Sequence, residues 1–174
     1  MRKFATAAAA SAALAAILGC GGSSSTLAPG QSPTCTVTLS GGLAGTYDCK
    51  PALAAWASAN NTGGFTFTVG TSQSSPYITV AIGFPGEPHT GSYLNTGSGA
   101  TGGVSVTSSA GVATQVWAAT TGNTPTGSYS LTFTSVSSAV TTSSGKAYTT
   151  NGSLAATLSP LTAQSGSITL SATF

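Results

Sequence analysis

The feature that most constrains the fold is a regular alternation of apolar and hydroxyl-bearing side chains. It is clearest over residues 166–174, where isoleucine, leucine, alanine and phenylalanine alternate with threonine and serine. Successive side chains of a β-strand point to opposite faces of a sheet, so this period of two predicts a strand with one buried face. We predict further strands with turns between them, over residues 65–69, 77–84, 91–94, 104–107, 112–119, 126–135 and 146–158.

These segments are separated by short turns rich in glycine, serine and threonine, and no helical period links them. Many short strands with such turns are typical of two packed antiparallel sheets. We therefore predict an all-β fold, a single antiparallel β-sandwich of the jelly-roll or immunoglobulin-like type, over residues 35–174. A segment of about 140 residues has the size of one ordinary domain.

The N-terminal end has the pattern of an export signal. Arg2 and Lys3 precede an uncharged, alanine-rich run over residues 4–18, which is shorter than the roughly 20 apolar residues that span a bilayer. The run ends in Ile17-Leu18-Gly19-Cys20, which resembles the lipobox of bacterial lipoproteins. The resemblance implies that residues 1–19 are removed and that Cys20 is acylated. The alternatives are a plain secretory signal, or a buried alanine-rich helix.

The same resemblance bears on location. Residues 20–34 are rich in glycine, serine and proline and should form a flexible tether from the acylated Cys20 to the domain. Gly21 is not aspartate, so by similarity to lipoproteins of diderm bacteria there is no inner-membrane retention signal. We expect the protein in the outer membrane, on the periplasmic or the surface side, held by fatty acyl chains such as palmitate.

The domain also resembles uncharacterised small β-sandwich lipoproteins of diderm bacteria. The resemblance lies in its opening Cys-x-Val-Thr-Leu-Ser-Gly and in its later Gly-Ser-Tyr-Ser-Leu-Thr-Phe and Gly-Ser-Ile-Thr-Leu-Ser-Ala-Thr-Phe segments. It implies no particular activity.

The first hairpin of the domain is predicted in one register. If Cys35 lies opposite Cys49, then Val37 faces Tyr47, and the apolar residues of both strands share one face. In the oxidising compartment implied by export, we expect a Cys35–Cys49 disulfide. Two free thiols or a metal pair are the alternatives, although this Cys-x13-Cys spacing is not that of a metal site.

Residues 50–59 have two possible structures. Their alanines favour a short helix that starts at Pro51, whereas the turn predicted at residues 60–64 favours a hairpin into the strand at 65–69. We prefer the hairpin. In both cases we expect Trp56 to pack inward.

Charge excludes several kinds of partner. Once residues 1–19 are removed, the charged side chains are Asp48, Lys50, Glu87 and Lys146, which sum to zero. Nucleic-acid binding and binding of acidic lipid headgroups both require a cluster of Lys and Arg, so we expect neither. About a third of the chain is serine or threonine, and these hydroxyls must cover the surface that charges usually cover.

Catalytic and metal-binding candidates are few. A hydrolase would have to use His89, the single histidine, with Asp48 or Glu87, and the chain has no Gly-x-Ser-x-Gly motif. Two-carboxylate glycoside hydrolysis would need Asp48 and Glu87 together across a cleft. The pair Glu87 and His89 falls short of the three or four ligands of a zinc site, so we read this segment as an exposed polar turn and expect no cofactor.

The exposed aromatic residues are the remaining binding candidates. A platform for sugar stacking could be formed by Trp56, Trp117, Tyr77, Tyr93, Tyr129 and Tyr148, although aromatics at alternating strand positions are more often core. Of these, Trp56, Trp117 and Tyr93, together with His89, are the candidate ligand-binding residues. We therefore predict a membrane-anchored, non-enzymatic lipoprotein of the cell envelope with an adhesion or binding role toward a glycan or an envelope protein. The alternative is a carbohydrate-binding module that uses exposed aromatics, and a hydrolase that uses His89 is third.

Overall fold

The computed structural model describes residues 34–174 except 51, 98, 111–112, 123–125 and 162–165. The predicted signal peptide, Cys20 and the tether lie outside the described residues, save residue 34. The described part is all-β, so it offers no helix that could cross a membrane. Its eleven strands are β1 (Thr36–Gly41), β2 (Gly45–Asp48), β3 (Leu53–Ala57), β4 (Thr62–Val69), β5 (Tyr77–Pro85), β6 (Gly91–Leu94), β7 (Thr101–Ala110), β8 (Ala113–Thr120), β9 (Ser128–Thr142), β10 (Gly145–Pro160) and β11 (Ile168–Thr173).

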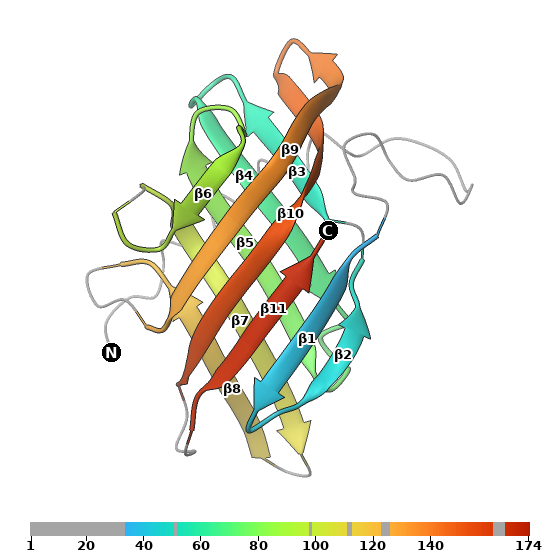
Figure 1. Cartoon of the computed structure of the whole chain (residues 1–174), viewed down its shortest axis with the longest axis vertical. Coiled ribbons are helices and arrows are strands. Elements are labelled where there is room, and N and C mark those ends of the chain that lie inside the picture. The colour runs from blue at the N-terminus through green and yellow to red at the C-terminus, as the bar shows by residue number, and fades with distance from the viewer. Residues whose placement is uncertain (1–33, 51, 98, 111–112, 123–125, 162–165) are drawn as a thin grey trace.

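The eleven strands form one continuous antiparallel sheet that folds into two layers. One layer has the order β2-β1-β11-β10-β9-β6 and the other the order β3-β4-β5-β7-β8, and Figure 1 shows the first layer in front of the second. Strand β10 joins the layers at both of its ends: residues 145–148 pair with β3, and residues 159–160 pair with β8. All pairings are antiparallel, as the sandwich prediction required.

The inward faces of both layers meet in one core. The alternation predicted for residues 168–174 is present in β11, where Ile168, Leu170 and Ala172 are buried and the residues between them are exposed. Phe133 of β9 lies at the centre of an aromatic cluster, with ring centroids 5.5 Å from Phe65, 5.6 Å from Tyr93, and 6.0 Å from both Phe84 and Phe174. These partners come from both layers, so the cluster holds the layers together.

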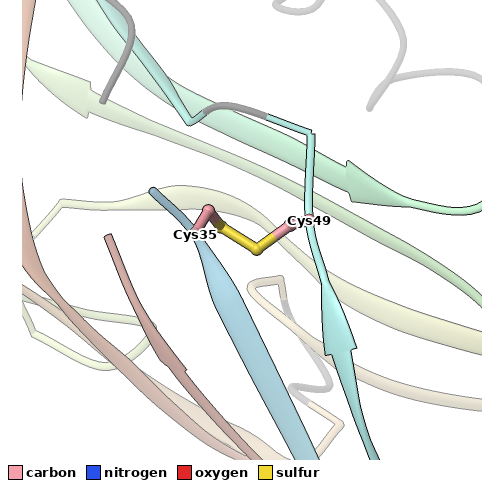
Figure 2. Close-up of a disulfide and its surroundings, with 2 residues drawn as sticks. All are labelled: Cys35 and Cys49. Atoms are coloured by element: carbon pink, nitrogen blue, oxygen red, sulfur yellow. A yellow bond between two sulfur atoms is a disulfide. The ribbon is translucent and has the colours of Figure 1, made fainter. Parts of the chain in front are cut away.

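The first hairpin has the predicted register. Val37 lies opposite Tyr47 and Leu39 opposite Gly45, and the residues with Val37 on its face are buried or half-buried. Cys35 and Cys49 form a disulfide with Cα atoms 5.1 Å apart (Figure 2). Just beyond it, the Lys50 amide donates a hydrogen bond of 2.8 Å to the Thr68 carbonyl of β4. The disulfide therefore closes the hairpin at the end where it meets the other layer.

Residues 53–57 are a strand and not a helix, as we preferred. Strand β3 pairs with β4 from Leu53 opposite Thr66 to Ala57 opposite Thr62. The predicted turn at 60–64 is wrong in its second half, because β4 already begins at Thr62. Position 63 of this strand requires glycine, because a Cβ atom there would collide with the ring of Phe84.

Several strands are longer than predicted, and β9 and β7 show why. Strand β9 continues to Thr142, although the pattern ended at residue 135, because the N-terminal half of β10 pairs with it as far as Gly145 opposite Thr142. Strand β7 begins at Thr101, within the predicted loop, because Gly102 and Gly103 pair with β5 and Gly103 also pairs with β8. In both places pairing with a neighbour extends a segment whose own sequence lacks apolar alternation.

Candidate functional site

Two of the aromatic candidates belong to the core. Trp117 is 3% exposed and its indole N–H donates a hydrogen bond of 3.3 Å to the Gly166 carbonyl. Tyr93 is 4% exposed, its ring lies 4.3 Å from that of Phe84, and its hydroxyl accepts a hydrogen bond of 3.0 Å from the His89 amide. Burial raises the pKa of Tyr93. Neither ring is available to a ligand.

Trp56 is half-buried and packs against the core, as predicted. Its indole N–H donates a hydrogen bond of 3.0 Å to Asn61 Oδ1, and the Lys146 ammonium lies 5.4 Å from the ring centroid. One face of this ring is therefore occupied by a cation of the protein itself. An exposed platform built from both tryptophans does not form.

The residues proposed for hydrolysis do not come together. His89 is exposed, its ring lies beside that of Tyr93, and its Nδ1 donates to the Thr90 carbonyl at 2.9 Å. Asp48 ends β2, opposite Thr36, whereas Glu87 lies in the loop after β5. In the described part of the chain, the hydrogen bond of the His89 ring is thus made to a main-chain carbonyl and not to a serine or a carboxylate. No group of three or more His, Cys, Asp or Glu gathers there.

Glu87 takes part in an ionic cluster that the sequence did not indicate. Its carboxylate accepts hydrogen bonds of 2.7 and 3.0 Å from the Lys146 ammonium and a further one from the Tyr148 hydroxyl. The hydrogen bonds from Lys146 and then from Tyr148 lower the pKa of Glu87. The pKa of Tyr148 is raised, mainly by burial of its hydroxyl and secondly by the hydrogen bond that it donates to Glu87. Glu87 lies in an exposed polar turn, as predicted, with its side chain 41% exposed, and its carboxylate also ties the loop after β5 to β10.

This cluster gives a pH-dependent prediction. Because the pKa of Glu87 is lowered in the folded state, the stabilisation that its charge supplies is present above the ordinary carboxyl pKa of about 4.3 and is lost as the pH falls through the folded value. We expect Glu87→Gln to lower the melting temperature slightly at about pH 7, and the difference from the unmodified protein to vanish at about pH 2. Thermal unfolding followed by circular dichroism measures both. A difference that is equal at the two pH values would contradict this role.

The outward face of the front layer carries a regular array of hydroxyl groups, which we call the hydroxyl face. Strand pairing aligns its side chains in three rows that cross up to six strands. The first row is Asp48, Thr36, Thr173, Ser153, Thr132 and Ser92. The second is Thr46, Thr38, Ser171, Ala155, Ser130 and Leu94. The third is Ser40, Thr169, Thr157 and Ser128. These side chains are exposed or half-buried, and Asp48 at the β2 edge is the one charged residue among them.

The hydroxyl face is hollowed into a shallow, open groove of about 510 Å³. Its floor is formed by β1, β11, β10 and β9, and one wall by residues 94–96 after β6. Asn95 fixes this wall, because its side-chain N–H₂ donates 3.2 Å to the Gly127 carbonyl and its Oδ1 accepts a hydrogen bond of 3.2 Å from the Tyr129 amide. The lining contains no charged side chain, and most of it is serine, threonine or asparagine.

The groove hydroxyls partly pair with one another. Ser40 and Thr169 are joined by a hydrogen bond of 2.5 Å across β1 and β11, and either can be the donor. A hydroxyl has one donor and two acceptor positions, so such a pair retains capacity for further bonds. Leu94, 41% exposed, adds an apolar surface at the wall. The arrangement can thus bind a neutral polar molecule by many weak contacts.

Comparison with protein-family models, curated proteins and solved structures found no significant match to this chain. The site is therefore defined by its own geometry. Sequence reasoning predicted the abundance of exposed hydroxyls but missed the groove, because β1 and β6, which line it together with β9, β10 and β11, lie far from those three strands in the chain. The alternation of Thr and Ser in each strand was the signal that could have pointed to it.

Proposed function

We propose that this protein is an exported, lipid-anchored lipoprotein of the outer membrane that acts by binding and not by catalysis. The observation that supports the binding role is the groove in the hydroxyl face, whose described lining residues are uncharged. The anchor is supported by the sequence alone, through the lipobox that ends at Cys20 and the Gly/Ser-rich segment after it.

The residues that could support catalysis have structural partners instead. Glu87 bonds Lys146 and Tyr148, and His89 lies beside Tyr93 and bonds a main-chain carbonyl. These contacts favour a binding protein over a hydrolase. The buried Trp117 and the half-buried Trp56 also make the groove a better candidate surface than an aromatic platform.

Replacement of Cys20 tests the anchor. We expect Cys20→Ala to remove the acylation site, so that the protein leaves the membrane fraction or accumulates with its signal peptide attached. Several acyl chains hold a protein firmly in a bilayer, whereas a protein without acyl chains lacks this anchor. Membrane fractionation with immunoblotting, with and without globomycin, measures this. A variant that loses its signal peptide and stays in the membrane fraction like the unmodified protein would refute the lipid anchor, and Cys49→Ala, which leaves the lipobox intact, is the matched control.

A further inference from the structure

We infer that the groove on the hydroxyl face binds a neutral glycan chain, through hydroxyl groups and not through aromatic rings. The inference rests on the proposed binding function and names its ligand class. It differs from recognition by exposed tryptophans, because the lining contains no tryptophan and its single tyrosine, Tyr129, is buried.

The first argument is charge. Among the residues that the structure describes, no Lys, Arg, Asp or Glu lines the groove, and the Lys146 ammonium is already paired with Glu87. An anionic ligand such as a phosphate or an acidic polymer would give up its hydration without gaining an opposite charge. Charge complementarity therefore selects an uncharged ligand.

The second argument is hydrogen-bonding chemistry. The groove presents hydroxyls from four adjacent strands, and each hydroxyl both donates and accepts. A sugar also carries several hydroxyls that do both, so each can bond into an existing pair such as Ser40 and Thr169 without leaving a group unsatisfied. A ligand with only acceptors would leave the acceptor positions of these hydroxyls unused.

The third argument is shape. Sheet geometry places neighbouring side chains within a row about 4.8 Å apart, from one strand to the next, and separates successive rows by roughly 7 Å along the strands. These spacings are on the scale of one sugar ring. Leu94 and Ala155 provide apolar contact for the C–H face of such a ring. Because the groove is shallow and open, a chain can lie along it, whereas a small ligand would remain mostly solvated.

The test is affinity electrophoresis of the lipidated full chain in mild detergent. Native gels contain dextran, mannan, xylan or β-glucan as neutral polysaccharides, or alginate as an anionic one. We expect at least one neutral polysaccharide to retard the protein and alginate to have no effect. Retardation by none of the four, or by alginate alone, overturns the inference.

Matched variants locate the site. Ala155→Trp fills the groove and should reduce retardation at least 10-fold, whereas Ala81→Trp places the same ring at an exposed position of β5 in the other layer and should leave it unchanged. Thr169→Val removes one hydroxyl and keeps the shape of the side chain, and should weaken binding by about 2- to 10-fold. Equal loss in both tryptophan variants, or no loss in Ala155→Trp, overturns the assignment to the groove.

These outcomes are independent of the anchor. A protein that stays membrane-bound through Cys20 but is retarded by no neutral polysaccharide refutes the glycan ligand alone. A protein that is retarded but does not depend on Cys20 for its location refutes the lipid anchor alone.

Discussion

Phe133→Ala should lower the free energy of unfolding by about 3–5 kcal/mol, the usual cost of removing a buried phenylalanine ring. Phe133 is 1% exposed and its ring contacts aromatic rings from both layers, including Phe65 of β4 and Phe84 of β5. Because these neighbours are themselves held in strands, the layers cannot collapse to fill the space. Urea unfolding of the purified protein, followed by circular dichroism, gives the free energy.

Two controls separate this effect from a general sensitivity to mutation. Phe133→Leu retains most of the apolar volume and should cost clearly less than the alanine variant. Leu161→Ala truncates a residue that is 56% exposed and should change stability by less than about 0.5 kcal/mol. If Phe133→Ala costs no more than Leu161→Ala, the aromatic cluster does not join the layers as described.

Removal of the disulfide should cost about 3 kcal/mol, because the bond closes a loop of roughly 15 residues in the unfolded chain. The double variant Cys35→Ala/Cys49→Ala avoids a free thiol and tests this by urea unfolding. The first hairpin gains further from the bond, since among the described strands β2 pairs with β1 alone, at the edge of the front layer. We expect β2 to be the first element to separate in the variant, seen as faster amide hydrogen exchange over residues 45–48.

A reducing agent provides the control. It should destabilise the unmodified protein by a similar amount and leave the double variant unaffected, because the variant has no bond to reduce. Equal stability of the unmodified protein with and without reductant, under conditions where thiol titration shows full reduction, would contradict a stabilising role for the bond.

Much of the fold follows from local pattern. The alternation in residues 168–174 predicted β11 and its buried face, because a strand's side-chain period is two whatever its neighbours are. The register of Val37 opposite Tyr47 followed from two constraints that agree, the apolar pattern and the cysteine positions. Strand ends were less predictable: β9 runs seven residues past its apolar alternation because β10 supplies its hydrogen-bond partners.

The site was less predictable because it, too, depends on contacts between segments that are far apart in the chain. Glu87 and Lys146 are 59 residues apart in the chain, and no local pattern indicates that the loop after β5 lies against the start of β10. Trp117 and Tyr93 have the residue type of a binding platform, but their burial depends on which layer covers them. Residue type therefore indicated candidates, whereas contact decided between core and surface.

Local sequence patterns were enough to predict the all-β class, the buried face of each clear strand and the pairing of Cys35 with Cys49, and composition showed the near absence of charge. These depend on neighbours two to fifteen residues away, within the reach of strand period and hairpin geometry. The tertiary structure was needed to show that β1 and β6 lie with the consecutive strands β9, β10 and β11 around one groove, and that Glu87 is paired with Lys146 and Tyr148. Those features depend on strand order, which is set by how the whole core packs and not by any single segment.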